Sequence, residues 1–206
     1  MRIHRLVRIA ALVVLSAEGS AYAEASELRL LSGERGGFGA FLVMGPYPLP
    51  KGMSASSGLA YVPPGVDESK LSPRVGVQVG SAAWKLAYDP SGVIDVNKAL
   101  GAWNAKDQIA YAGAILRVKR AGTYTCLFGA DDGSAVLLDG KVLFSRDEAR
   151  PLRSDDDAAR MELAAGDHPL LLKLHQRDEA WVFKARCVDD SLSPSPDLSL
   201  VLPGTT

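Results

Sequence analysis

AGTYTCLFGADDGSAVLLDGKVLFSR, residues 121–146, holds the most specific pattern of the chain: apolar strands separated by short polar turns. Alternation over residues 123–128 has the period of a strand with one buried face. The acidic turn 131–133 breaks this run, and an apolar strand follows at 135–138. The Asp-Gly pair at 139–140 tolerates positive φ, which predicts a two-residue hairpin into the next strand. Because an isolated hairpin is barely stable in water, we expect these strands to belong to a larger sheet.

Strand patterns continue through most of the chain, notably at 38–44, 75–79, 84–88 and 109–118 and again between 123 and 187. Helix signals are few; residues 95–100 could form a single helical turn, capped by Asp95 and ended by Gly101. Short strands with frequent turn signals predict an all-β fold, an antiparallel β-sandwich (jelly roll) of about nine or ten strands with at most one short helix. Its expected extent is residues 24–188.

The order of these motifs resembles the PA14-like and galactose-binding-like jelly rolls. Their shared pattern runs Gly-x-Tyr-x-Phe, then Ser-Asp-Asp-Gly, then Asp-Gly-Lys. This chain departs from it at Cys126, where an aromatic residue is usual, and at Ala130, where serine is usual. The stretch 163–187 is similar to the closing Leu-x-Ala-Gly-x-His hairpin of these modules, and 41–50 to a Gly-Pro-aromatic opening. The resemblance covers about residues 38–188.

The resemblance implies a calcium site at the acidic turn. In lectin-like PA14 members, adjacent aspartates joined by a cis peptide coordinate calcium, which in turn binds sugar hydroxyls. Calcium takes six to eight oxygens, so further ligands must come from another loop. The residues that the resemblance and this requirement select are Asp131 and Asp132 with the acidic supply at 154–157, above all Asp155 and Asp156. In the alternative interpretation, the two turn aspartates accept backbone N–H groups and the run 155–157 is a solvated loop.

Three aromatic residues, Trp84, Tyr88 and Trp103, are candidates for a ligand-binding platform. Sugar C–H faces pack on aromatic rings while the hydroxyls need fixed polar partners. The alternative is ordinary core packing, because large aromatic side chains are mostly buried in such folds. Trp181 shares a strand face with Phe183 and is expected in the core.

The N-terminus has the pattern of an export signal. Arg2, Arg5 and Arg8 precede a short apolar run, and Ala21-Tyr22-Ala23 is a small-x-small cleavage site. We therefore expect residues 1–23 to be a signal peptide and the mature chain to be periplasmic, displayed on the cell surface or secreted. The remaining sequence contains no apolar run long enough for a transmembrane segment.

Two Pro- and Ser-rich stretches predict irregular structure. Residues 46–74 are expected to form a long surface connection packed loosely over the sandwich. Residues 189–206 are expected to form a flexible C-terminal tail or linker.

Cys126 and Cys187 form a candidate disulfide, since an exported chain meets oxidising conditions. Both thiols share strand faces with core aromatic residues, so a bond between their strands is geometrically plausible. The alternative is a pair of buried free cysteines, which behave as small hydrophobes.

The sequence contains no convincing catalytic constellation. His168 and His175 are seven residues apart on one expected strand, so they face opposite sides and should be solvated separately. A hydrolase using Asp131 and Asp132 as its carboxylate pair is disfavoured, because neighbouring turn residues seldom have the required separation.

The formal net charge is −1, and the lysines and arginines are scattered among acids, which argues against a nucleic-acid partner. The sequence thus favours a non-enzymatic binding module for glycan or cell-envelope polysaccharide. The alternatives are a structural domain that docks an envelope protein, or an accessory module of a larger envelope enzyme.

Overall fold

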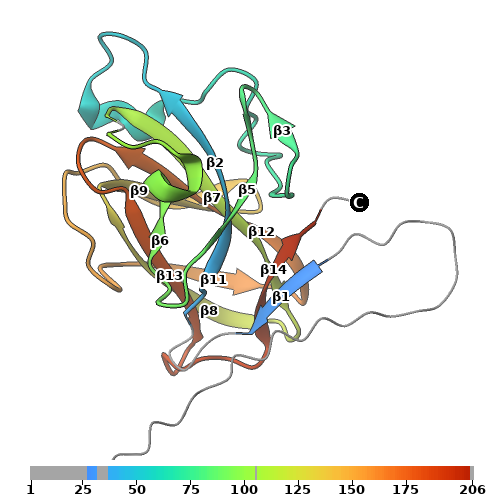
Figure 1. The fold of residues 1–206 in the computed structure, drawn as a ribbon. Helices are drawn as coiled ribbons and strands as arrows, with labels where there is room; N and C mark the ends of the chain where they lie inside the picture. The colour runs from blue at the N-terminus through green and yellow to red at the C-terminus, as the bar shows by residue number, and fades with distance from the viewer. Residues whose placement is uncertain (1–26, 32–36, 105, 205–206) are drawn as a thin grey trace, which may run out of the picture.

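The fold is an antiparallel β-sandwich, as the sequence predicts (Figure 1). The computed structural model describes residues 27–31, 37–104 and 106–204. The expected signal peptide, residues 1–23, lies outside the described residues. Within the described residues, no helix is long and apolar enough to cross a membrane.

The larger sheet has eight strands. Six of them follow one path, each hydrogen-bonded to the next: β1 (Glu27–Leu31), β14 (Leu198–Pro203), β7 (Gln108–Val118), β12 (Gly166–Gln176), β9 (Gly133–Leu138) and β10 (Lys141–Arg146). β2 (Ala40–Pro48) pairs with the first half of β7, and β14 pairs with the second half of the same strand. β5 (Lys85–Tyr88) pairs with β2.

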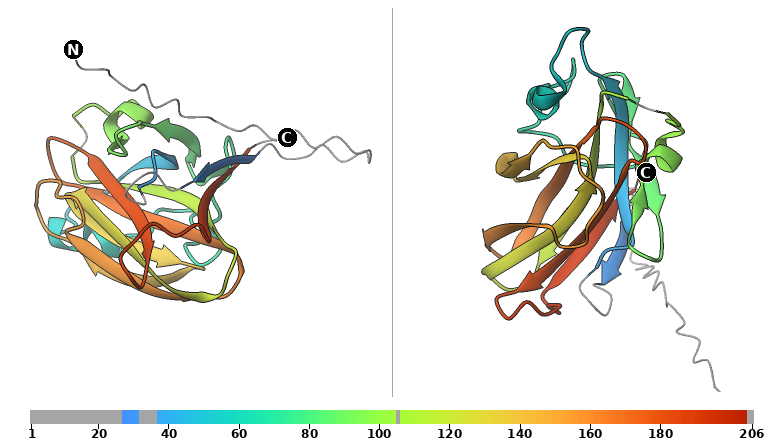
Figure 2. Two further views of the ribbon diagram at one scale, coloured as in Figure 1. Left: turned by 90° about the horizontal axis from the view of Figure 1, so that it is seen from below. Right: turned by 90° about the vertical axis from the view of Figure 1, so that its left-hand side faces the viewer.

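The smaller sheet has four strands in the order β11 (Asp157–Leu163), β8 (Gly122–Asp131), β13 (Val182–Asp189) and β6 (Ile94–Asp95). A separate pair, β3 (Gln78–Val79) and β4 (Ala82–Ala83), completes the strands of the described residues. The two larger sheets form the layers seen in Figure 2. The described chain thus has fourteen strands, more than the nine or ten expected, because short and terminal strands carry weak sequence patterns.

The chain passes from one sheet to the other at the acidic turn. Asp131 pairs with Val182 in the smaller sheet, whereas Gly133 pairs with His175 in the larger one. Between the sheets, the ring of Phe41 meets that of Phe183 edge to face at 5.1 Å. The turn is therefore a crossing between layers, and its position is fixed by both sheets.

Two local predictions are confirmed. Asp139 and Gly140 both have positive φ, 49° and 75°, and close the β9–β10 hairpin. The one α-helix among the described residues, α1 (Val96–Leu100), is capped by the Asp95 carboxylate, which accepts from the Lys98 N–H, and it ends at left-handed Gly101.

The long connection packs closely on the outer face of the larger sheet. We call residues 49–74 the cover segment; it includes a 3-10 helix, η1 (Ala55–Ala60). Its Glu68 accepts from Lys173 Nζ at 2.7 Å and from the Tyr111 hydroxyl at 2.6 Å. The segment therefore packs more closely than the expected loose connection, and its polar partners allow Lys173 to be buried.

His175 is fully buried under the cover segment, and the expectation of a solvated side chain is wrong. Its Nδ1 lies 2.7 Å from Asp147 Oδ1, and its ring lies against Gly58, where a Cβ would overlap it. His168 instead bonds Asp139 and the Ala164 carbonyl oxygen, so it links two turns.

The C-terminal segment differs from the expected tail. Leu198–Pro203 form β14, which lies between β1 and β7 and is buried over most of its length. Its Leu-Ser-Leu-Val-Leu sequence has too little alternation to indicate a strand, because both of its faces are covered.

Candidate functional site

The acidic turn at residues 131–133 has the backbone geometry that the PA14 resemblance implies, with a cis peptide between Asp131 and Asp132. Asp132 is buried, and its two carboxylate oxygens accept the backbone N–H groups of Arg150 and Arg177, at 3.2 and 2.8 Å. Asp131 is half-buried and accepts the backbone N–H of Leu152. Both carboxylates therefore accept backbone N–H groups, as in the alternative interpretation of the turn.

A buried arginine lies against this turn. The Arg150 side chain is 7% exposed, and its Nε donates to the Asp132 carbonyl oxygen at 3.0 Å. Its terminal nitrogens reach Ser134 Oγ and Asp156, and they form an ion pair with Asp157. The loop that carries Arg150 approaches β8 so closely that a Cβ at Gly129 would overlap the Arg153 carbonyl group. The glycine of the Phe-Gly-Ala-Asp-Asp motif thus lets the loop reach the turn.

The remaining predicted calcium ligands are held by arginines. Asp155 makes a two-bond pair with Arg186, at 2.9 and 2.8 Å. Asp156 lies within 3.1 Å of Arg150 and 3.5 Å of Arg146. Among the residues that the structure describes, no group of three or more His, Cys, Asp or Glu side chains is arranged to hold a metal ion. As they stand, Asp131, Asp132, Asp155 and Asp156 do not fit a common calcium ion, and calcium binding stays a prediction.

Asp131 differs electrostatically from its neighbours. Burial, and secondly the negative charge of Asp132, raises the pKa of the Asp131 carboxyl from 3.8 to about 6. Near neutral pH it is therefore a carboxylate that is only weakly stabilised by its surroundings. No cation is in contact with it among the described residues, in contrast to Asp155 and Asp156.

A surface hollow of about 290 Å³ lies between β5, β6 and α1. The residues around it that can meet a ligand are Leu86, Tyr88, Asp89, Asp95, Lys98 and Ala99. Tyr88 is 58% exposed, so its ring is available beside the hollow. Asp89 is held by Ser91, whose N–H and hydroxyl both bond its Oδ1, and these bonds lower the pKa of Asp89. The hollow thus combines an aromatic ring with a carboxylate and an ammonium group.

The three residues predicted to form an aromatic platform, Trp84, Tyr88 and Trp103, lie in different parts of the structure. Tyr88 lies at the hollow, whereas Trp84 is 1% exposed and belongs to the core. The prediction of Trp84 as a ligand-binding residue is therefore wrong: its side chain packs inward from the position before β5. Trp103 is 66% exposed and lies outside the residues that line the hollow. Trp181 is fully buried, as expected.

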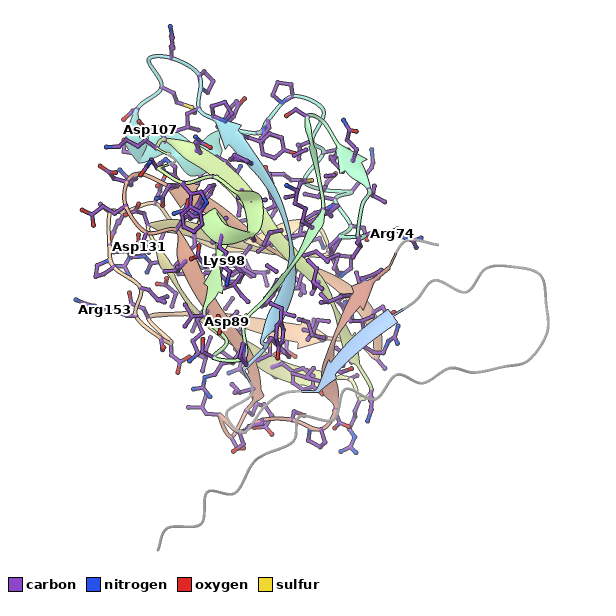
Figure 3. All side chains as sticks on the ribbon, in the orientation of Figure 1. Arg74, Asp89, Lys98, Asp107, Asp131 and Arg153 are labelled. Carbon is purple, nitrogen blue, oxygen red and sulfur yellow. The ribbon has the colours of Figure 1, made fainter. Side chains whose placement is uncertain are left out.

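The hollow and the acidic turn lie at the same end of the smaller sheet. Val182 of β13 pairs with Asp95 on one side and with Asp131 on the other. Two strand spacings place the Cα atoms of Asp95 and Asp131 about 10 Å apart. In Figure 3, Asp131 lies to the left of Lys98 and Asp89. The two features therefore border one surface, which we call the β6–β8 end.

The two cysteines lie directly opposite each other on β8 and β13. Both thiols are free and fully buried, and the hydrogen bond between them, with burial, raises the pKa of Cys187. A buried thiol with a raised pKa is a poor nucleophile, which argues against a nucleophilic role for Cys187.

Sequence reasoning missed the arginines of the turn and the polar residues of the hollow. Arg150 and Arg177 belong to loops with no motif of their own, and only the fold brings them to Asp132. Asp89 directly follows the candidate residue Tyr88, and Lys98 lies in the expected short helix; these were the sequence features that could have indicated them as site residues. Their positions around one hollow depend on the pairing of β5 with β2, which no local pattern encodes.

No protein-family model and no curated protein matches this chain. Solved structures do resemble it. The PA14 domain of the MpAFP antifreeze protein is 16% identical with a TM-score of 0.47, over 90% of this chain and 96% of that one. A PA14 sugar-binding domain from an RTX adhesin is 16% identical with a TM-score of 0.43, over 75% and 92% of the two chains.

An anti-sigma factor domain-containing protein is 18% identical with a TM-score of 0.42, and the match covers 55% of this chain and 41% of that one. This chain therefore spans less than half of that protein's length. Both of the first two structures are PA14 domains, the family whose motifs the sequence resembles.

Proposed function

We propose that this chain is an exported, non-enzymatic module that binds glycan through the hollow beside Tyr88. The observation that carries the proposal is an exposed tyrosine ring beside a 290 Å³ hollow that Asp89, Asp95 and Lys98 also border. A pyranose can place its C–H face on the ring while its hydroxyls bond the carboxylates and the ammonium group. Export is supported by the signal-like sequence of residues 1–23.

The local structure supports a preformed site. Asp95 is fixed as the cap of α1, and Asp89 is fixed by Ser91, so neither carboxylate must be ordered when a ligand binds. Since ordering side chains costs free energy on association, this rigidity favours binding even of small saccharides. An envelope polysaccharide would add further sugar units along the β6–β8 end.

The test is a titration of the mature chain with a panel of neutral, acidic and amino oligosaccharides, followed by calorimetry. We expect Tyr88→Ala to weaken binding by about tenfold or more, since it removes the stacking surface. Trp103→Ala is the matched control, because it removes an exposed aromatic ring outside the hollow. Equal loss in both variants, or no binding to any saccharide, would contradict the proposal.

A second candidate function, docking to an envelope protein, is favoured by one observation. β10 is an edge strand of the larger sheet, and its Val142 and Leu143 are exposed. An edge strand with apolar side chains can accept a strand from a partner. If no saccharide binds and a Val142→Lys variant loses association with a purified envelope protein, this function replaces the first.

A further inference from the structure

The acidic turn contains a cation of its own, the guanidinium group of Arg150. Its Nε bonds the Asp132 carbonyl oxygen at 3.0 Å, one terminal nitrogen lies 3.1 Å from Asp156, and the other donates to Ser134 Oγ at 2.9 Å. Asp157, which is buried, forms an ion pair with the same group. A single planar group thus ties the turn, the start of β9 and the start of β11 together.

The oxygens of the turn face N–H donors. Calcium needs six to eight oxygens at 2.3–2.6 Å around one point. Here both carboxylate oxygens of Asp132 accept backbone N–H groups, from Arg150 and Arg177. The carbonyl of the same residue is also occupied by Arg150 Nε. A calcium ion at this place would have to displace three hydrogen bonds of one buried residue.

The charges nearby are balanced without a metal ion. Asp156 and Asp157 both lie beside Arg150, and Arg146 reaches the same two carboxylates at 3.5 and 3.2 Å. Two buried or half-buried acids are therefore shared by two guanidinium groups. An additional divalent cation would meet the positive charge of Arg150 at short range, which opposes its binding.

We propose that Arg150 takes the structural place of the calcium ion that the PA14 resemblance implies, so that the turn is formed without calcium. The cross-link that calcium would make between the turn and a neighbouring loop is made by the guanidinium, which belongs to the chain itself. The β6–β8 end is then folded at any calcium concentration. This inference does not depend on what the hollow binds.

The first experiment is a thermal melt and calorimetric titration of the mature protein in EGTA and then in millimolar calcium. We expect no change in Tm and no saturable heat. A ligand that binds only the folded state must raise Tm, so a calcium-dependent rise in the wild type would overturn the proposal. This measurement needs no variant, and it stands even where a variant fails to fold.

The second experiment uses Arg150→Ala, with Arg153→Ala as the matched control from the exposed part of the same loop. Removing one of the two guanidinium groups that share Asp156 and Asp157 should lower Tm by roughly 10 °C in the first variant, and the second variant should hardly change it. Arg150→Lys keeps the charge without the planar fork and should fall between them. Equal Tm values for the two alanine variants would overturn the proposal.

Calcium should then matter only where the guanidinium is missing. In Arg150→Ala, Ser134 loses its donor, and Asp156 and Asp157 keep only the Arg146 guanidinium. Millimolar calcium should then recover part of the lost Tm, more than sodium chloride of equal ionic strength. If calcium gives no more recovery than sodium chloride, Arg150 is an ordinary ion-pair partner and does not occupy a cation's place.

Discussion

At the scale of single residues, the acidic turn shows how one sequence motif can serve two chemistries. The Asp-Asp-Gly pattern and its cis peptide agree with the resemblance. The contacts of Asp132 do not, because two backbone N–H groups and Arg150 surround it. The motif therefore predicts the backbone of the turn, while the contacts of the carboxylates depend on the neighbouring loop that carries Arg150.

Asp131 should give the protein a specific pH dependence. Its pKa is raised from 3.8 to about 6 by burial and by Asp132, so the folded state holds this proton more tightly than the unfolded state does. The contribution of Asp131 to the free energy of unfolding therefore falls as pH rises from about 4 to about 6. Above about pH 6 the carboxyl is ionised in both states, and this loss of stability no longer grows. After allowance for solvent screening, we expect about 1 kcal/mol or less.

Asp131→Asn removes this penalty, because the amide oxygen can still accept the Leu152 N–H. Urea unfolding at pH 4, 5, 6 and 7 should show that the variant gains stability over the wild type as pH rises. The exposed Asp107→Asn, which also removes one carboxylate from the surface, is the control. A constant difference for Asp131→Asn would mean that its carboxyl titrates normally.

At the scale of elements, the main departure from the sequence prediction is the cover segment. Its Pro- and Ser-rich composition indicates a loop, and a loop gives no hydrophobic period from which its contacts could be inferred. The alternation in β12 places Lys173 and His175 together on one face. Nothing local shows that this face is covered, since Glu68 and Asp147 come from distant segments.

Glu68 should be essential to the packing of the cover segment. Glu68→Ala leaves the buried Lys173 ammonium and the Tyr111 hydroxyl without their shared acceptor, which should lower the free energy of unfolding by roughly 3 kcal/mol. Lys70→Ala, an exposed change two residues away, is the control. The double variant Glu68→Leu, Lys173→Met should recover the part of the loss that comes from the buried ammonium, since an apolar pair needs no partner, while the Tyr111 hydroxyl still lacks its acceptor. Chemical denaturation of the four proteins measures these differences.

The cysteine pair yields a second prediction at this scale. Residues directly opposite in an antiparallel pair have Cα atoms about 4.5–5.5 Å apart, within the range that a disulfide spans. We expect the Cys126–Cys187 bond to form in chain folded under oxidising conditions, and an intact mass lower than that of the reduced chain by the mass of two hydrogens. Closing a loop of about 60 residues would stabilise the fold by roughly 4 kcal/mol. Two titratable thiols in the oxidised, unfolded chain would disprove it.

At the scale of the whole molecule, the fold class was predictable and the pairing of its ends was not. Alternation and turn residues indicate antiparallel strands wherever one face is buried, which covers most of the segment from Phe38 to Val188. β14 is buried on both faces and has no such alternation. The residues of the hollow beside Tyr88 all lie within 86–99, but their arrangement around one hollow depends on the packing of β5, β6 and α1, for which the sequence has no motif.

Removing β14 should therefore destabilise the entire sandwich. A chain that ends at Asp197 leaves β7 without its partner over Ile115–Val118 and exposes the buried leucines that β14 contributes. We expect circular dichroism melts to show a broad transition at much lower temperature. Leu192→Ser, an exposed change in the same C-terminal segment, should melt like the wild type. A truncated chain with a normal melt would show that residues 198–206 are dispensable for folding.

The pairing of β1 with β14 sets Glu27 directly opposite Pro203. The chain therefore enters and leaves the sandwich at neighbouring points, separated by about one strand spacing. A short glycine linker could join these ends, and new termini could be opened in the turn at Asp139-Gly140 to give a circular permutant with the same sheets. The same closeness makes the sandwich suitable for insertion into a surface loop of a host protein, because the host would have to open by only a few ångströms to accept it.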